Sequence, residues 1–358
     1  MTAAVGRGVI TAVQVVIGVD THQDQNVAVA IDQQGVRLAE CYVPATTHGY
    51  RDLERWSRKL GEVRAVGIEG TGSYGAGLAR FMTGRGFTVI EVNRPDRSIR
   101  FQKGKSDPTD AEMAARAVLA GVANATPKSG EGETEIIRML KNTKDSAVKA
   151  RTQAVNQMKA LVVTAPAKLR ETLDGLTAAA LAARCKSFRP GRLENPTAAA
   201  KYALQSLACR YLQLDREIRD LQAQLERLTR MTAPALVNIF GVGPDTAAAL
   251  LISAGSNPQR IHSEAAFASL CGVSPVPASS GKTNRHRLNR GGDRQANAAL
   301  YRIVLVRLSH DLRTREYMDR RTREGVSKAE VIRCLKRYVA REVFSALRHS
   351  SKVPCVAP

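Results

Sequence analysis

The sequence predicts an α/β N-terminal domain (residues 12–125), a helical coiled-coil middle (130–232) and a mostly α C-terminal domain (233–350). Three observations favour this fold class. Short β-branched runs alternate with helical patterns in the first third of the chain, a heptad seam follows, and glycines and arginines gather near the end. A chain of 358 residues is long enough for two or three such domains.

The N-terminal domain is predicted from five apolar runs and the helical patterns between them. The expected strands are residues 15–20, 26–32, 36–42, 65–69 and 88–92, and the expected helices are 50–60, 74–83 and a last one that ends near 119. Pro108 suits the first turn of that last helix. Three strands followed by alternating helix and strand are typical of a mixed sheet with covering helices.

The middle region is predicted to be two helices joined by a hairpin at residues 190–196, where two prolines and a glycine interrupt the pattern. The first helix spans Glu133 to Thr164. The second has a coiled-coil seam with alternating steps of four and three, at Leu207, Tyr211, Leu214, Ile218, Leu221, Leu225 and Leu228. This seam must pack either on the first helix or on the same helix of a second chain, and the sequence leaves both open. Further helices are expected at 245–254, 296–310 and 328–349.

Charge is concentrated at the end of the chain. Lys and Arg number 54 against 33 Asp and Glu, a net charge of +21, and residues 281–358 alone contribute +12. Such a surface predicts a polyanionic partner, with nucleic acid favoured over a membrane. No apolar run of about 18 residues and no leader-like segment is present, so we expect a cytoplasmic protein. Six cysteines without a C-x-x-C pair argue against a zinc site or a disulfide framework.

Four carboxylates stand at positions that suit metal binding. Asp20 and Glu69 end two predicted strands, and Asp107 and Asp110 open a helix three residues apart, hence on one helix face. A sheet that pairs the first and fourth strands would bring all four to one edge, where oxygen ligands can hold divalent cations. Each residue alone also fits a strand end or a helix cap. The order Asp, Glu, Asp-x-x-Asp resembles the RNase H-like nucleases, in particular the RuvC-like junction resolvases. The actin-like ATPases also begin with a strand that ends in Asp, but have a glycine beside it.

A second cluster lies in the C-terminal region. Gly241-Val-Gly-Pro resembles a helix-hairpin-helix element, in which backbone N–H groups approach a phosphate, although a tight turn explains the glycines as well. The serines of Ser279-Ser-Gly-Lys either shape a turn or act as nucleophiles, since the flanking basic side chains can orient a phosphate. The predicted nucleic-acid contacts are Gly241, Gly243, Lys282, Arg285, Arg287, Arg290 and Arg294.

The order of these motifs closely resembles the DEDD transposases of the IS110 family of bacterial insertion sequences, over about residues 12–310. The matching segments are Gly-Val-Asp-Thr-His (18–22), Glu-Gly-Thr-Gly (69–72), Lys-Ser-Asp-Pro-Thr-Asp-Ala (105–111), Gly-Val-Gly-Pro (241–244), Cys-Gly-Val-Ser-Pro (271–275) and Ser-Gly-Lys-Thr (280–283). The resemblance implies a RuvC-like domain in which Asp20, Glu69, Asp107 and Asp110 bind Mg²⁺ or Mn²⁺. It also implies a C-terminal transposase domain with Ser280 as nucleophile, and Ser279 leaves that assignment open by one residue.

The family resemblance further implies recombination of double-stranded donor and target DNA. A structured non-coding (bridge) RNA would guide the reaction, and the protein would act as a homo-oligomer, a dimer that becomes a tetramer on DNA. Guidance by base pairing accounts for a basic protein without a sequence-reading module. Two alternatives remain: a hydrolytic RuvC-type Holliday junction nuclease, which needs the tetrad but no serine, and a non-catalytic RNA- or DNA-binding protein.

Overall fold

The computed structural model describes residues 14–93, 104, 106–282 and 286–350. The chain divides into two compact units, residues 1–130 and 131–358. Arg285, one of the predicted nucleic-acid contacts, lies outside the described residues. Within the described part, no helix is long and apolar enough to cross a membrane.

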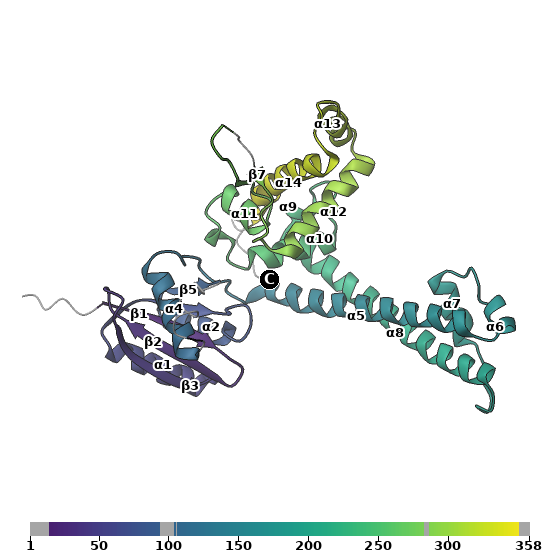
Figure 1. Ribbon diagram of the computed structural model, residues 1–358, viewed down its shortest axis with the longest axis horizontal. Coiled ribbons are helices and arrows are strands. Elements are labelled where there is room, and N and C mark those ends of the chain that lie inside the picture. Colours follow the sequence, from purple (N-terminus) through teal and green to yellow (C-terminus); the bar gives the residue numbers. More distant parts are fainter. Residues whose placement is uncertain (1–13, 94–103, 105, 283–285, 351–358) are drawn as a thin grey trace, which may run out of the picture. The chain divides into compact units, whose positions relative to one another are not determined.

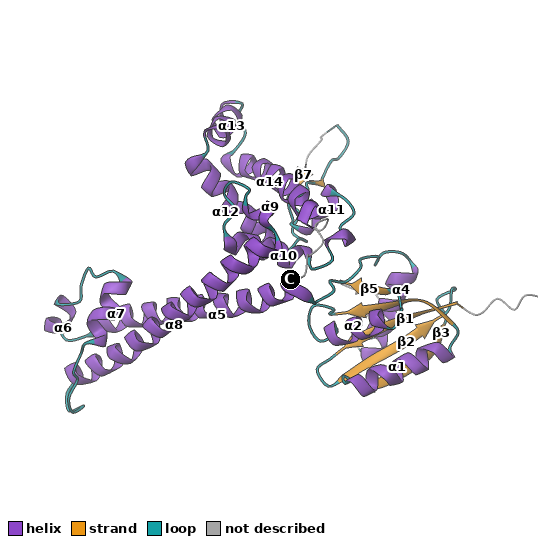
Figure 2. Cartoon of the chain, turned by 180° about the vertical axis from the view of Figure 1, so that it is seen from behind, coloured by secondary structure: helices purple, strands orange, loops and turns teal. Residues whose placement is uncertain are grey.

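The first unit contains a five-stranded mixed sheet with the strand order β3-β2-β1-β4-β5 (Figure 2). The strands are β1 (Gln14–Thr21), β2 (Gln25–Ile31), β3 (Arg37–Pro44), β4 (Glu62–Glu69) and β5 (Val89–Val92). The first three form an antiparallel meander, and β4 adds parallel to β1. The predicted mixed sheet is therefore confirmed, and the central strand β1 is buried on both faces.

Helices cover both faces of this sheet. Helices α1 (Thr47–Lys59) and α2 (Ala76–Gly84) pack on one face, where Leu53 and Leu78 meet inward residues of β1 and β4. Helix α4 (Asp107–Leu119) lies on the other, where Ala111 and Ala115 contact apolar side chains of β1 and β2. Alternating side chains along the strands thus supply two separate apolar faces.

The second unit begins with two long helices, α5 (Gly132–Thr164) and α8 (Pro196–Thr232), which run side by side as a hairpin (Figure 1). Two short helices that the sequence analysis did not predict, α6 (Ala167–Glu171) and α7 (Ala178–Lys186), close its far end. Asn195 caps α8 by accepting a hydrogen bond from the Ala198 amide, and Pro196 occupies the first turn.

Within this chain the seam of α8 packs on α5, the first of the two packings that the sequence left open. Its buried members include Ile218, Leu225 and Leu228, whereas Leu214 and Leu221, predicted as core, are only half-buried. Ile218, Leu225 and Leu228 keep the predicted heptad steps of seven and three, so this part of the seam is buried as expected.

The rest of the second unit is a helical lobe, as predicted. Its helices are α9 (Pro234–Val237), α10 (Pro244–Ala254), α11 (Glu264–Leu270), α12 (Arg294–His310), α13 (Leu312–Arg323) and α14 (Lys328–Ser350), with a 3₁₀ turn η1 at Pro258–Arg260. A short hairpin of β6 (Val276–Pro277) and β7 (His286–Arg287) projects from it. The core is continuous with the end of the long helices, because Ile137 of α5 and Leu225 of α8 belong to the same buried cluster.

Removing a buried side chain from the seam tests this packing. Leu225 is fully buried, so Leu225→Ala should lower the free energy of unfolding by about 2–5 kcal/mol. Leu221→Ala, a matched change four residues earlier at a half-buried position, should cost less than half as much. Urea unfolding followed by circular dichroism compares the two variants, and equal losses would contradict the packing of α8 on α5.

Candidate active site

Asp20 and Glu69 lie at the carboxyl ends of two neighbouring parallel strands. The register pairs Val19 of β1 with Ile68 of β4, so Asp20 and Glu69 are side by side at the next step. The Thr21 hydroxyl donates a hydrogen bond to the Glu69 carbonyl oxygen over 2.9 Å and joins the two strand ends. The expected pairing of the first and fourth strands is confirmed.

Both strand-end carboxylates belong to the sheet face that α4 covers. A Cβ atom at Gly18 would lie 2.0 Å from the Ala111 carbonyl oxygen, and one at Gly67 would lie 2.7 Å from a valine side chain of the same helix. The missing side chain at Gly18 lets the backbone of α4 rest directly on β1. Because side chains alternate along a strand, Asp20 and Glu69, two residues beyond these glycines, face the same side.

The first turn of α4 supplies the other two carboxylates. Ser106 is the N-cap residue, and its side chain accepts a hydrogen bond from the Thr109 amide. Asp107 and Asp110 follow in the first turn, where the partial positive charge of the helix terminus favours acidic side chains. Asp110 is buried, at 3% exposure, whereas half of the Asp107 side chain is open to solvent. The cap and Pro108 therefore fix where the carboxylate pair begins.

The carboxylates that meet here repel one another. Burial raises the pKa of Asp20 above its usual range, His22 opposes that rise, and the charges of Asp110 and Asp107 add to it. A cation bound between them would remove this repulsion. Several carboxylate oxygens and one imidazole form a donor set that suits Mg²⁺ or Mn²⁺. The residues at this edge of the sheet therefore fit a divalent cation.

His22 is a member of this cluster that the sequence analysis did not single out. Its Nε2 atom lies 3.2 Å from Asp20 Oδ2 and 3.5 Å from Asp107 Oδ1. Ligand atoms of these three residues all lie within 4.8 Å of one another, a spacing that can hold a metal ion. One feature of the sequence could have pointed to His22: it follows Asp20 by two residues, and this spacing keeps both side chains on one face at a strand end.

Ser280 belongs to the second unit, on the β6–β7 hairpin. Val276 pairs with Arg287 and Pro277 with His286, and the chain turns at Gly281, which has a φ of +54°. Both Ser279 and Ser280 are exposed. The hairpin thus presents the serines at its tip, which suits a nucleophile and a turn equally.

The basic residues predicted to contact nucleic acid flank this hairpin. Lys282, Arg287, Arg290 and Arg294 are all exposed. The loop that leads to Arg294 is held by a close backbone contact, since a Cβ atom at Gly292 would lie 2.1 Å from the Gly272 nitrogen. This contact explains the two glycines by packing, and it fixes the start of α12 beside the turn after α11.

Gly241 and Gly243 occupy the turn before α10. Gly241 has a φ of +87°, and a Cβ atom there would lie 3.3 Å from Ile303 of α12, so packing alone favours glycine. Gly243 is the N-cap of α10, and Thr246 Oγ1 bonds both its amide and its carbonyl group. The structure therefore accounts for the tight turn, while the phosphate contact of both glycines stays a prediction.

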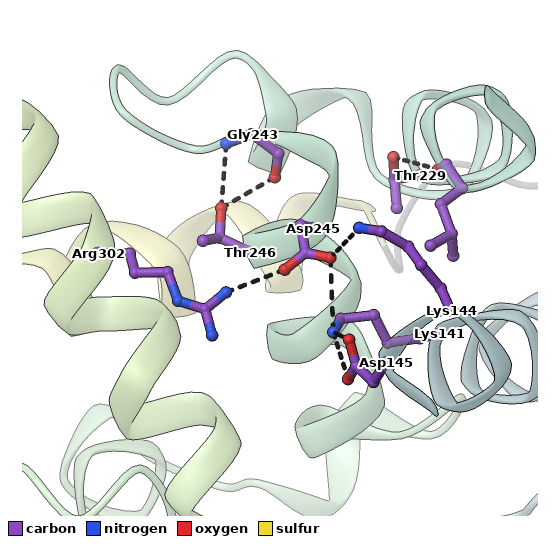
Figure 3. A network of polar contacts seen from close by, with 9 residues as sticks. Lys141, Lys144, Asp145, Thr229, Gly243, Asp245, Thr246 and Arg302 are labelled. Atoms are coloured by element: carbon purple, nitrogen blue, oxygen red, sulfur yellow. Dashed lines mark hydrogen bonds and ion pairs between the residues drawn. The ribbon is translucent and has the colours of Figure 1, made fainter. Parts of the chain in front are cut away.

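Asp245, in the first turn of α10, joins three cations from two other helices (Figure 3). Its carboxylate lies 2.6 Å from Lys144 Nζ, 3.5 Å from Lys141 Nζ and 2.9 Å from Arg302 Nη1. Burial alone would raise the pKa of Asp245, but the hydrogen bond from Lys144 and the surrounding positive charges lower it overall. We call these four residues the Asp245 clasp. It fastens α10 to the long helix α5 and to α12.

Comparison with known protein families gives two matches in chain order. A DEDD transposase model of the IS110 group, described as "Transposase", matches residues 17–165, which include all four acidic residues of the predicted tetrad. A model described as "Transposase IS116/IS110/IS902 family" matches residues 233–319, which include the serine hairpin. Together the two matches cover about two thirds of the chain.

Two curated relatives are similar over part of their length. An uncharacterized 43.6 kDa protein of insertion element IS110 from Streptomyces coelicolor is 30% identical over 159 residues, which is 42% of this chain and 38% of the relative. An uncharacterized 42 kDa protein of insertion element IS900 from Mycobacterium paratuberculosis is 28% identical over 165 residues, 45% of this chain and 40% of the relative. The aligned stretch thus spans about two fifths of each relative. With both family models matched in order, this chain belongs to the IS110 family of DEDD transposases.

Proposed function

We propose that the chain is a DNA transposase that cuts and rejoins donor and target DNA with an RNase H-like, RuvC-like N-terminal domain and a C-terminal serine. The observation that carries this proposal is the convergence of strand ends and helix start. Asp20 and Glu69 end adjacent parallel strands on the face where α4 begins with Asp107 and Asp110. Strand topology, helix position and acid type all agree with a phosphodiester-processing site.

Asp20, Glu69, Asp107 and Asp110 would hold Mg²⁺ or Mn²⁺, and His22 lies within reach of the same ion. A bound divalent cation supplies positive charge that stabilises the negative charge developing on a scissile phosphate. The chain's own contribution is to fix these side chains. The strand register sets Asp20 beside Glu69, and the Ser106 cap sets the first turn of α4.

Ser280 is proposed as the nucleophile. Its Oγ atom would form an ester bond with the phosphorus, while the bond from phosphorus to the deoxyribose oxygen breaks and the serine proton ends on that oxygen. The phosphoserine ester keeps the energy of the broken bond for rejoining. Exposure of the hairpin tip lets a DNA strand reach the hydroxyl.

The partners that the family resemblance implies fit the charge of the chain. Residues 281–358 contribute +12 of the net charge of +21, enough to neutralise phosphates of both DNA and a guide RNA. Pairing between a bridge RNA and DNA would select the sites, and a homo-oligomer would hold two DNA partners. The long helices already bury their seam within one chain, so an oligomer would use other surfaces or the half-buried row of Leu214 and Leu221.

The second candidate function is a hydrolytic RuvC-type nuclease. The acidic cluster alone would suffice for it, because a water molecule can replace the serine as the nucleophile. A non-catalytic nucleic-acid-binding protein is disfavoured, since Asp20, His22 and Asp107 bring ligand atoms within 4.8 Å of one another, a spacing that such a protein does not need. The covalent intermediate separates the first two reactions, because only a serine mechanism leaves DNA attached to protein.

The tetrad is tested by removing one charge. Asp110→Asn should lower strand cleavage in Mg²⁺ by more than about 100-fold, because the buried carboxylate would no longer neutralise the cation. Asp24→Asn, a control at an exposed acid of the same unit, should cleave normally. Binding of Mn²⁺ followed by electron paramagnetic resonance gives a second readout, and unchanged Mn²⁺ affinity together with full cleavage by Asp110→Asn would refute the tetrad.

The nucleophile is tested by alanine at each serine. Ser280→Ala should fold and bind DNA but form no covalent adduct on a denaturing gel and no recombinant, whereas Ser279→Ala should keep substantial activity. A serine that only shapes the turn would tolerate alanine at a cost of about 1 kcal/mol in stability. The reverse result would move the nucleophile to Ser279. Recombination by the double variant would instead favour attack by water.

The guide is tested by withholding RNA. Purified protein with donor and target DNA should yield recombinants only when a structured RNA transcribed from DNA flanking the reading frame is added, because base pairing supplies the specificity. Changing the target-pairing segment of that RNA should redirect the product, as read by sequencing. Recombination at an unchanged site without RNA would show that the protein reads DNA itself.

A further inference from the structure

A hollow of about 680 Å³ lies beneath the serine hairpin in the helical lobe. Its walls are the turn after α11, the β7 strand with the residues that follow it, and helices α13 and α14. The size is that of a site for a nucleotide or a drug-sized molecule. We call it the hairpin pocket, and all of its lining residues belong to the second unit.

The hairpin pocket is lined by more cations than anions. Its lining includes five Arg and Lys side chains and two glutamates: Arg287, Arg321, Arg333, Lys336, Arg337, Glu324 and Glu330. Three of the arginines have a carboxylate partner within the lobe: Arg321 pairs with Glu324, Arg333 with Glu330, and Arg337 with Glu264 of α11. Lys336 and Arg287 have no ion pair among the described residues.

Lys336 is the more informative of the two, because it is buried, with 8% of its surface exposed. Its Nζ atom donates to Asn297 Oδ1 over 3.0 Å. The orientation of the Asn297 side-chain amide is fixed, because its Nδ2 atom donates to the carbonyl oxygens of Cys271 and Gly272 at 2.8 and 3.2 Å. Of its three donor hydrogens, the ammonium group therefore uses one, on a neutral acceptor.

A buried ammonium without an anion is energetically unfavourable, because its lost hydration is not replaced. Burial lowers the pKa of Lys336, and the charge of Arg333 lowers it further. Well-packed apolar side chains would fill this place at lower cost, so the position of Lys336 favours an anionic ligand in the hairpin pocket. A phosphate group satisfies both an ammonium and a guanidinium at once.

The hairpin pocket is joined to the serines by the chain itself. Arg287 pairs with Val276 in the hairpin whose tip holds Ser280, and it lines the pocket at the base of that hairpin. The three residues from Pro277 to Ser280 span at most about 11 Å. Strand phosphates follow one another at about 3.4 Å of helix axis per nucleotide. A strand held in the pocket can therefore pass the serine within a few nucleotides.

We propose that the hairpin pocket binds a backbone phosphate of the DNA strand that is presented to Ser280, with Lys336 and Arg287 as its ligands. This inference rests on the proposed function and adds a positioning site to it. Lys336 touches no reacting atom. It holds the strand so that the neighbouring phosphodiester meets the hairpin tip.

The test compares Lys336→Met with Lys328→Met in the full-length protein. Both changes remove one lysine charge from α14, but Lys328 is exposed and does not line the pocket. Binding of a fluorescein-labelled DNA duplex is measured by anisotropy over a range of salt concentrations. Lys336→Met should flatten the plot of log K against log salt by about 0.9, the slope of one lost phosphate contact, and Lys328→Met should leave it unchanged.

Further arms separate the alternatives. Arg287→Gln should also flatten the slope, and the double variant should lose less than the sum, because both side chains would bind one phosphate. Lys336→Met should melt no lower than wild type, since it removes a lone buried charge. An unchanged slope for Lys336→Met would overturn the inference. Binding of inorganic phosphate in the pocket that DNA does not displace would overturn it as well.

These outcomes are distinct from failure of the proposed function. If wild-type protein forms the covalent adduct while Lys336→Met keeps its full salt slope, the pocket inference alone is wrong. If the slope falls as expected but no variant or wild-type protein ever cleaves DNA, the pocket stands and the transposase proposal fails.

Discussion

The contact between α4 and β1 at Gly18 is the constraint on which the acidic site depends. Helix backbone and strand backbone touch there without a side chain between them, because any Cβ atom would overlap the Ala111 carbonyl oxygen. This contact sets the distance between the first turn of α4 and the ends of the strands. Asp110 is therefore buried near Asp20, whose pKa is raised by burial and further by the negative charge of Asp110. A larger residue at position 18 would lift the helix and separate the carboxylates.

The second unit is organised by charge as well as by apolar packing. Lys141 and Lys144 are nearly buried on α5, and the Asp245 clasp gives both a carboxylate partner on α10. Loss of that one carboxylate would leave the buried Lys144 ammonium without its anionic partner, while Lys141 would keep Asp145. Stranding a buried charge is more costly than losing a surface ion pair. Lys336 differs from these lysines because, among the described residues, its polar partner is a neutral amide. This contrast within one unit is the reason for proposing an anionic ligand at Lys336.

Much of the fold could be predicted because local sequence and tertiary structure agree. β-branched runs gave the strands, and Pro108 with its neighbouring Asp residues gave the start of α4. Helix α13 was missed because its sequence is mostly polar and lacks a clear apolar stripe, and its packing on α12 and α14 cannot be read from the sequence. The partner of the α8 seam could not be predicted, since a heptad pattern specifies an apolar face but not what covers it. His22 was missed because one histidine after a strand does not by itself indicate a metal site. Its neighbour Asp107 lies 85 residues later in the sequence and becomes a neighbour only in the fold.

The position of Ser280 explains why a distant anchor is useful. A hydroxyl at the tip of an exposed two-stranded hairpin is accessible, but the tip has little packing to hold a substrate in line. Orientation of reacting groups can contribute about 7–11 kcal/mol to catalysis, and that contribution is lost when either group moves freely. The hairpin pocket lies instead between α14 and the turn after α11, which Asn297 holds by hydrogen bonds to Cys271 and Gly272. A strand bound there would be held by the rigid part of the lobe, so the hairpin needs to supply only the hydroxyl and the pocket supplies the alignment.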